Sequence, residues 1–154
     1  MGEGQGWREE SAVTGGRPMN LNEIKEVLVA RITFYLEPHL KNLHHYYIED
    51  DGGKIKVVGA TDDTTSGLYV LVGIFITEEA RRMYISNINL PDFMRHQGIG
   101  RKLIKVIYKA ATELRYELFI SPMTQAFYES MKKRGAMEYE KPYVLKIVDG
   151  TILD

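Results

Sequence analysis

The sequence predicts a mixed α/β domain, in which helices flank one central, mostly antiparallel sheet that contains a single pair of parallel strands. Apolar residues recur at helical spacing over residues 21–36 and again over residues 103–114, whereas most segments between them alternate with a period of two. The second helical segment also separates two short apolar strands. A helical crossover of this kind joins parallel strands, so these two strands should lie parallel in the sheet.

Length and composition indicate one ordinary globular domain. The chain has 154 residues, of which 44% are hydrophobic and 27% charged, with a net charge of -1. This balance argues against binding nucleic acid through bulk positive charge, and no apolar run reaches the length of a membrane span, so we expect neither partner. The chain has no cysteine, which excludes disulfides and cysteine metal sites and fits a cytoplasmic protein.

The N-terminal residues differ from the rest in composition. Residues 1–18 hold five of the 14 glycines and little apolar material, which predicts a flexible tail before one domain over residues 19–154.

A helix should open this domain. Asn20 offers an N-cap and Glu23 follows three residues later, as in a capping box. We expect the helix to run to about Leu36, because Pro38 lacks an N–H group and its ring opposes continuation. One face of this helix carries Leu21, Ile24, Leu28 and Ile32.

Strands should follow this helix. Residues 43–49 and 54–60 alternate in polarity around an Asp-Asp-Gly-Gly turn, which predicts a hairpin. Residues 68–77 are apolar on both faces, so we expect a central strand covered on both sides, and Gly73 predicts a bulge or a close backbone neighbour. After a short turn, residues 82–90 should return as its antiparallel neighbour.

The C-terminal third should complete the sheet. Residues 116–120 form a short apolar strand, expected to lie parallel to the one that ends at Leu90. Ser121 and Pro122 are typical of a helix start, and Gly135 is typical of its end. Residues 136–140 and 143–148 are then expected to pair as antiparallel strands.

The stretch INLPDFMRHQGIGRKLIK at residues 88–105 carries the clearest functional signal. A glycine-bearing loop follows a strand and leads directly into a helix, whose N-terminal N–H groups and dipole attract anions. Gly98 and Gly100 let the backbone approach a ligand closely, and Arg95, Arg101 and Lys102 add positive charge. We therefore expect a nucleotide-like or coenzyme diphosphate as ligand.

With its R-x-x-G-x-G loop between a strand ending at Pro91 and an amphipathic helix, the chain over residues 20–148 resembles the GNAT superfamily of acyl-CoA-dependent N-acyltransferases. The resemblance implies a GNAT-like fold with a splayed parallel strand pair, acetyl-CoA as co-substrate and no metal. It implies direct acetyl transfer to a primary amine of a small molecule or protein. The coenzyme-binding residues that it implies are Ile88, Asn89 and Leu90 for the pantetheine arm, His96, Gln97, Gly98, Ile99, Gly100 and Arg101 for the diphosphate, and Arg95, Lys102 and Thr124 beside them.

The catalytic residues are less defined. In this family a tyrosine on the helix after the second parallel strand usually protonates the leaving thiolate. A gap-free register from Ile120 to Gly135 places Thr124 at the customary asparagine and Met131 at the customary tyrosine, which leaves no acid. Allowing one extra turn before Gly135 makes Tyr128 the acid, and both registers remain open.

The general base has several candidates. These are the carboxylates of Glu78 and Glu79, of which we name Glu79, or a water held by Asn87 and Asn89. Two other functions remain as alternatives: a non-catalytic GNAT-like module that binds acyl-CoA or a regulatory partner, and a nucleotide-binding protein that uses the same anion site.

Two features of the architecture stay open. The family's usual first strand has no evident counterpart, so either the leader replaces it or strands 43–49 and 54–60 fill the edge of the sheet. The sequence does not decide the oligomeric state, and a homodimer is compatible with it.

Overall fold

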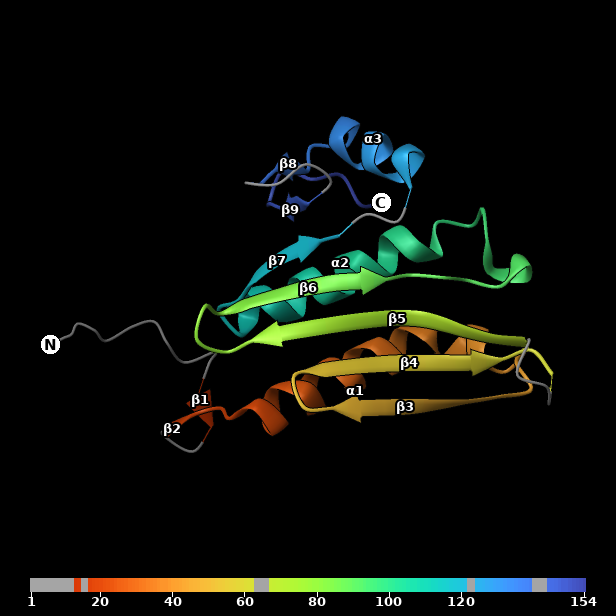
Figure 1. The fold of residues 1–154 in the computed structure, drawn as a ribbon, viewed down its shortest axis with the longest axis horizontal. Helices are drawn as coiled ribbons and strands as arrows, with labels where there is room; N and C mark the ends of the chain where they lie inside the picture. The colour runs from red at the N-terminus through yellow and green to blue at the C-terminus, as the bar shows by residue number, and fades with distance from the viewer. Residues whose placement is uncertain (1–12, 15–16, 63–66, 122–123, 140–143) are drawn as a thin grey trace, which may run out of the picture.

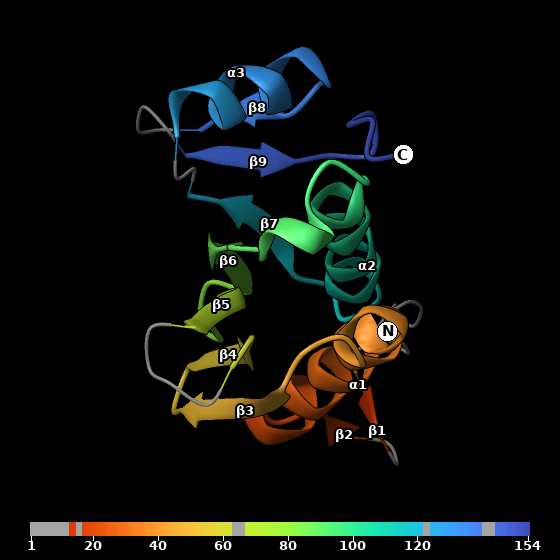
Figure 2. The same ribbon diagram turned by 90° about the vertical axis from the view of Figure 1, so that its right-hand side faces the viewer.

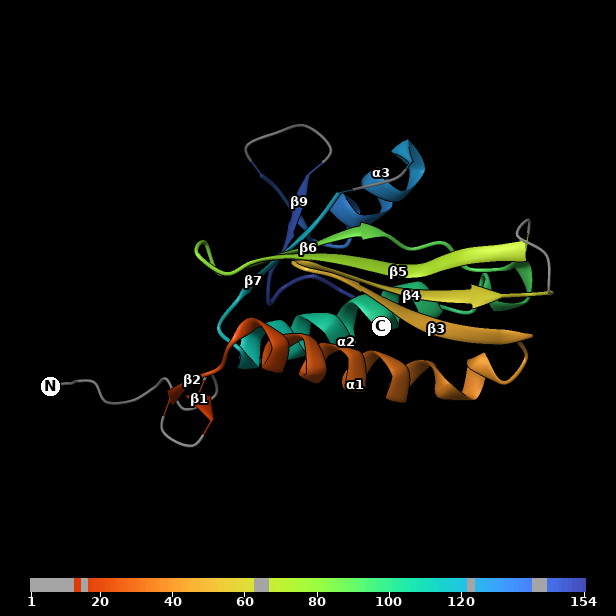
Figure 3. The ribbon, with the colours of Figure 1, turned by 60° about the horizontal axis from the view of Figure 1, so that its bottom comes forward.

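A computed structural model describes residues 13–14, 17–62, 67–121, 124–139 and 144–154. Within these residues, α1 and α2 lie side by side on one face of a seven-stranded sheet, and α3 lies on the other side near β8 and β9 (Figure 1; Figure 2; Figure 3). The elements are β1 (Val13–Thr14), β2 (Arg17–Pro18), α1 (Leu21–Leu40), β3 (His45–Asp51), β4 (Lys54–Ala60), β5 (Leu68–Thr77), β6 (Arg82–Asn87), the 3-10 turn η3 (Asp92–Met94), α2 (Ile99–Glu113), β7 (Glu117–Ile120), α3 (Gln125–Lys133), β8 (Met137–Glu138) and β9 (Leu145–Ile147).

The sheet has the strand order β3-β4-β5-β6-β7-β9-β8. Strands β6 and β7 are parallel, and the other neighbours are antiparallel. This arrangement confirms the mixed, mostly antiparallel sheet with one parallel pair. Among the described residues, β1 and β2 pair with each other and β3 occupies the sheet edge, so the β3–β4 hairpin fills the edge position that the sequence left open.

Helix α1 begins as expected and ends later than expected. Asn20 and Glu23 form the capping box, with both hydrogen bonds at 2.9 Å. The expected end near Leu36 is wrong, because the helix continues through Pro38 to Leu40. Pro38 is exposed while Leu40 is buried, so the packing of Leu40 against the core compensates for one missing hydrogen bond.

Strand β5 matches its expected bounds but not its expected surroundings. The pairing with β6 shifts register at Gly73, which confirms the bulge. The prediction that both faces are covered is wrong: Phe75 is 51% exposed and Leu68 is 41% exposed. Helices α1 and α2 cover one face of the sheet, and no helix in the described part of the chain covers β5 on the other face (Figure 2; Figure 3).

The start of α3 is also corrected. The helix begins at Gln125 with Thr124 as its N-cap, and the Thr124 hydroxyl accepts a hydrogen bond from the Phe127 N–H at 3.0 Å. Ser121 therefore does not cap it, and Pro122 lies outside the described residues. Gly135 follows the end of α3 with a φ of 103°, as expected for a helix that stops at a glycine.

Lys25 fastens α1 to the β3–β4 hairpin. It is the one charged side chain in the described part of the chain that is buried, with 6% exposed. Its ammonium donates to Asp50 Oδ1 at 2.6 Å and to the Gly52 carbonyl at 2.8 Å. The Lys25 side chain thus links the first third of α1 to the hairpin turn.

Replacing Lys25 with methionine is expected to lower the free energy of unfolding by about 1 to 2 kcal/mol, because two charge-assisted hydrogen bonds are lost while the aliphatic volume is kept. Urea denaturation measures this change. Lys109→Met, at an exposed position of α2, is the control and should change stability by less than about 0.5 kcal/mol. Equal effects in the two variants would contradict the role given to Lys25.

Candidate functional site

Strands β6 and β7 separate after a short parallel ladder. Their pairing runs from Arg82 opposite Glu117 to Ile85 opposite Ile120, and the Ser121 N–H still donates to the Ile85 carbonyl at 3.0 Å. Beyond Ile85, the chain that continues β6 stays with β5, and β7 turns away toward β9 (Figure 1). The parallel pair therefore opens into a splay.

The splay leaves one edge of residues 88–90 unpaired. The Asn89 N–H donates to the Val70 carbonyl of β5 at 3.1 Å, which holds this segment on the β5 side. Neither the N–H nor the C=O of Ile88 has a hydrogen-bond partner among the described residues. These groups can therefore pair with an extended ligand that carries amides, as a further strand would.

Two side chains form hydrogen bonds that stabilise the loop after Leu90. Arg95 Nε donates to the Leu90 carbonyl at 2.7 Å and its guanidinium lies 3.3 Å from Asp92. Gln97 Nε2 donates to the Phe93 carbonyl at 2.7 Å. Arg95, from which the sequence predicted positive charge beside a phosphate, thus also serves to fold the loop back onto the strand end.

The loop presents free N–H groups to one place. The backbone N–H groups of His96, Gln97 and Gly98 have no partner within the residues that the structure describes, and the first N–H groups of α2 follow directly. His96 and Gly98 both adopt left-handed backbone, with φ of 63° and 75°. At position 98 a glycine adopts this backbone without strain, and successive amides around such a turn suit an anion.

Arg101 adds an unsatisfied donor to this place. In the described part of the chain, its Nε is the single buried side-chain nitrogen or oxygen without a hydrogen-bond partner. Leaving a buried donor unpaired costs free energy, so its presence at a helix N-terminus points to a missing acceptor. At Gly100, a methyl group would lie 3.9 Å from Ile88 and 4.0 Å from Leu90, so the absence of a side chain keeps the space between loop and strand end open.

Two adjoining cavities follow from this geometry. A cavity of about 610 Å³ lies at the start of α2, and one of about 360 Å³ lies beside the unpaired strand end. They share Leu90, His96 and Phe127. The first is lined by Leu90, Met94, His96, Gln97, Gly98, Ile99, Gly100, Arg101 and Phe127, and the second by Ile88, Asn89, Leu90, Arg95, His96, Thr124 and Phe127.

The structure thus gathers all the residues that the sequence assigned to coenzyme binding except Lys102. Lys102 is exposed on α2 and does not line either cavity. Sequence reasoning missed Phe127, which lines both. Tyr128, the sequence-based candidate for the acid, is the next residue on α3 and lines neither cavity, because adjacent helix residues face different directions.

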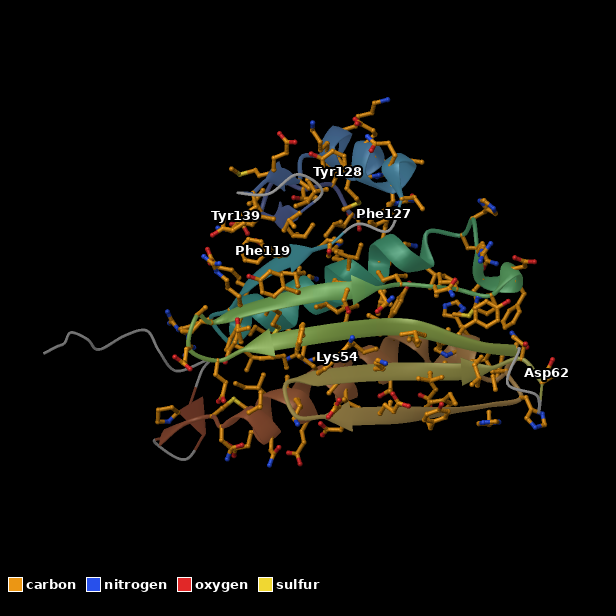
Figure 4. All side chains as sticks on the ribbon, viewed as in Figure 1. Lys54, Asp62, Phe119, Phe127, Tyr128 and Tyr139 are labelled. Carbon is orange, nitrogen blue, oxygen red and sulfur yellow. The ribbon has the colours of Figure 1, made fainter. Side chains whose placement is uncertain are left out.

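Tyr128 points to a different place. It is 5% exposed, its hydroxyl donates to the Glu138 carboxylate, and the Lys132 ammonium lies 5.3 Å from its ring centroid. In Figure 4, Phe127 lies on the side of α3 nearer α2, whereas Tyr128 lies nearer β8. Tyr128 lines neither cavity, and Met131, the other residue at the customary tyrosine position, is buried at 1% exposed.

Glu78 and Glu79 lie in the turn between β5 and β6, at the opposite end of β6 from Ile88. Both are exposed, and the structure does not bring them to the splay. No carboxylate of the described residues lines either cavity. Of Asn87 and Asn89, the sequence-based candidates for holding a water, Asn89 lines the cavity beside the strand end and Asn87 lines neither cavity.

Tyr35 connects α1 to the site. Its hydroxyl lies 3.5 Å from the Ile99 carbonyl in the first turn of α2, and burial raises the pKa of its phenol. The phenol therefore stays protonated at neutral pH and remains a donor. This contact joins α1 to the end of α2 that presents the free amides.

The arrangement can bind an elongated ligand with two chemically different halves. Free amides, the α2 dipole and Arg101 suit a diphosphate, and the unpaired edge at Ile88 suits an amide-containing arm. Groups of His, Asp or Glu that could hold a metal ion are absent from the described residues. None of the helices in that part of the chain combines the length and apolar character of a membrane span.

No family model matches the chain, and no curated protein matches it in sequence. Among solved structures, a probable acetyltransferase of the GNAT family from Chromobacterium violaceum is similar over 97% of this chain and 94% of its own, with 17% identity and a TM-score of 0.43.

Two further solved structures are similar over smaller shares. Nourseothricin acetyltransferase matches with 18% identity and a TM-score of 0.40 over 57% of this chain, and the match spans only 52% of its own length. An aminoglycoside acetyltransferase from an uncultured soil metagenomic sample matches with 17% identity and a TM-score of 0.39, over 81% of this chain and 91% of its own.

Proposed function

We propose that this chain is a GNAT-type N-acetyltransferase, which binds acetyl-CoA at the splay between β6 and β7 and transfers the acetyl group to a primary amine. One observation supports this most: an anion site with an unsatisfied arginine adjoins a strand end whose amides are unpaired. A coenzyme with a diphosphate at one end and an amide-rich arm at the other has both halves of this chemistry.

The binding mode follows from the two cavities. The diphosphate would accept hydrogen bonds from the N–H groups of His96, Gln97 and Gly98 and from Arg101. The pantetheine arm would pair with the backbone of Ile88 and run between the strand end and Phe127. In this mode the thioester would lie near the opening of the splay, beside Ile88 and Thr124.

The proposed reaction is a direct transfer. The neutral amine nitrogen attacks the thioester carbonyl and the carbon–nitrogen bond forms. The carbon–sulfur bond then breaks, and the leaving thiolate takes a proton from water, which releases CoA as a free thiol. A backbone N–H of the strand end can stabilise the oxyanion. Water held by Asn89 can remove the ammonium proton, since no described carboxylate lines the site.

Tyr128 remains the sequence-based candidate for the acid, and Tyr128→Phe tests it. A hydroxyl that already donates to Glu138 is not free to donate to a thiolate, so we expect turnover to fall by less than about tenfold, whereas loss of an acid costs roughly 10²–10⁴-fold. We also expect unchanged acetyl-CoA affinity and a loss of about 1 kcal/mol in stability. Steady-state thiol release, calorimetry and urea denaturation measure the three quantities.

Tyr139→Phe is the matched control, because the Tyr139 hydroxyl accepts from Arg82 at 2.6 Å and lines neither cavity. If turnover falls more than hundredfold in Tyr128→Phe but not in Tyr139→Phe, and acetyl-CoA affinity is unchanged, the Tyr128 hydroxyl leaves Glu138 and acts as the acid.

A non-catalytic acyl-CoA-binding module is the second candidate function. The absence of a carboxylate from the lining, with the Tyr128 hydroxyl engaged elsewhere, favours it. Release of CoA thiol from acetyl-CoA in the presence of a panel of primary amines, including small amines, polyamines and peptides with free N-termini, separates the two. Turnover with any amine above the rate without protein supports the enzyme, and its absence with all of them, at intact acetyl-CoA binding, supports the module.

A further inference from the structure

The proposed reaction creates a negative charge on the coenzyme sulfur when the carbon–sulfur bond breaks. A hydrogen-bond donor aimed at that sulfur would stabilise the charge and lower the barrier. Tyr128 does not supply this donor, because its hydroxyl donates to Glu138 and its side chain lines neither cavity. The donor can instead come from the residues that line the cavity beside the strand end.

Few side chains of that lining have a donor to spare. Arg95 already donates to the Leu90 carbonyl. His96 belongs to the loop that presents amides to the diphosphate, and Asn89 is the residue proposed to hold the water that deprotonates the amine. Thr124 is left. It follows β7, so it stands on the other branch of the splay from the strand end, at the start of α3.

The proton of the Thr124 hydroxyl is free to leave the helix. The hydroxyl oxygen accepts a hydrogen bond from the Phe127 N–H at 3.0 Å, as the N-cap of α3. That bond occupies one lone pair of the oxygen, so the O–H cannot point at the same N–H. Within the described residues the O–H meets no acceptor. It is therefore available to a ligand in the cavity that Thr124 lines.

We propose that Thr124 is a catalytic residue, whose hydroxyl donates a hydrogen bond to the coenzyme sulfur as the carbon–sulfur bond breaks. This inference rests on the proposed binding mode, in which the thioester lies beside Ile88 and Thr124. The electron pair of the carbon–sulfur bond passes to sulfur, and the O–H group holds the resulting thiolate. The hydroxyl keeps its own proton, and water supplies the proton that completes the free thiol.

This hydrogen bond should act on the transition state more than on the bound substrate. A thioester sulfur is neutral and a weak acceptor, whereas a thiolate is charged and a stronger one. A group that stabilises only the developing charge raises kcat and leaves the affinity for acetyl-CoA almost unchanged. The same group should lower the pKa of the thiol of bound CoA, because it favours the charged form.

Two variants that lack the hydroxyl have different side effects. Thr124→Gly keeps a residue that caps a helix about as well as threonine, and Thr124→Val keeps the shape of the side chain but loses the cap. Thr124→Ser is the matched control, because serine keeps both the hydroxyl and the cap. An effect that the glycine and valine variants share, and that the serine variant lacks, belongs to the hydroxyl.

The thiol of bound CoA gives the most direct readout, and it requires no acceptor amine. With protein in excess over CoA, the ultraviolet absorbance of the thiolate follows its titration, and the complex with S-methyl-CoA is the reference that removes the signal of the 10 tyrosines. We expect Thr124→Gly and Thr124→Val to raise the pKa of this thiol by about one unit above its value in the unmodified complex. Thr124→Ser should change it by less than about 0.3 units.

Turnover with an accepted amine should follow the same order. We expect kcat to fall by about tenfold in Thr124→Gly and Thr124→Val and by less than about threefold in Thr124→Ser. The affinity for acetyl-CoA, measured by calorimetry, should change by less than about threefold in all three variants.

The outcomes separate this role from the proposed function. If CoA binding is intact and loss of the hydroxyl leaves the thiol pKa unchanged, the role of Thr124 is overturned and the coenzyme site stands. A serine variant that behaves like the glycine variant would also overturn that role. If the unmodified chain binds neither CoA nor acetyl-CoA, the coenzyme site and the role of Thr124 are both wrong.

Discussion

Arg101→Met is expected to raise the stability of the protein and to lower its affinity for acetyl-CoA. The guanidinium Nε is buried without a partner, so removing it relieves an unpaired donor and should add about 1 kcal/mol to the free energy of unfolding. The same change removes a charged donor from the diphosphate, which should weaken binding by about tenfold to hundredfold. Urea denaturation and calorimetry measure the two effects.

The Arg101→Met test is selective because stability is expected to rise while acetyl-CoA affinity is expected to fall. A residue that only supports the fold would lower stability when removed, and any loss of affinity would follow from that. Lys109→Met, on the exposed side of the same helix, should change neither quantity. An Arg101→Met variant that is less stable, or that binds acetyl-CoA as tightly as the unmodified chain, would contradict the role given to Arg101.

Gly98→Asp is expected to reduce acetyl-CoA affinity on the order of hundredfold or more. Gly98 is the N-cap of α2 with left-handed backbone, and a carboxylate there would stand among the amides that receive the diphosphate. Repulsion between like charges a few ångströms apart is worth several kcal/mol in a partly buried site. The loss of affinity should be smaller at high salt, because dissolved ions screen the repulsion between the carboxylate and the diphosphate. Calorimetry at two ionic strengths measures it.

Gly98→Asn is the matched control, since asparagine has the same shape without the charge. Asparagine and aspartate both tolerate left-handed backbone better than other side chains, and a Cβ here would come within 3.3 Å only of the flexible end of Arg101. We expect the asparagine variant to lose no more than about tenfold in affinity. If both variants lose the same affinity, steric change rather than charge governs this position, and the anion site is misplaced.

The loop and its surroundings were largely predictable from sequence. Gly98, Gly100 and the basic residues beside them stand between a strand and an amphipathic helix, and that order of elements fixes where the free amides point. The structure adds what no pattern records: Arg95 turns back to the Leu90 carbonyl, and Arg101 is left without a partner. Such pairings depend on side-chain geometry across the loop, not on residue spacing.

The helix after β7 was the least predictable part of the site. Tyr128 and Phe127 are neighbours, so their side chains leave α3 in directions about 100° apart, and a shift of one residue exchanges their surroundings. Sequence alone cannot set that rotation, because it depends on the start of α3 at Gln125, three residues later than Pro122 would place it. Phe127 thereby came to line the splay, and Tyr128 came to face Glu138.

At Pro38 and Phe75 as well, tertiary packing overrides what the local sequence pattern predicts. A proline rule predicts a helix end, but the burial of Leu40 outweighs one missing hydrogen bond. An apolar run predicts a strand covered twice, but only the packing of helices decides which face is covered, and Phe75 is left in solvent. Local patterns located the elements, and tertiary packing decided their ends and exposed faces.

Calorimetric titration with acetyl-CoA and, in parallel, with ATP tests most directly whether the splay is an acyl-CoA site. Both ligands carry phosphates for the amides of residues 96–98, but only acetyl-CoA carries an arm that can pair with Ile88. We expect acetyl-CoA to bind at least about tenfold more tightly than ATP, as one or two additional hydrogen bonds and the burial of the arm would give. Equal affinities, or tighter binding of ATP, would contradict an acyl-CoA site and leave a phosphate site alone.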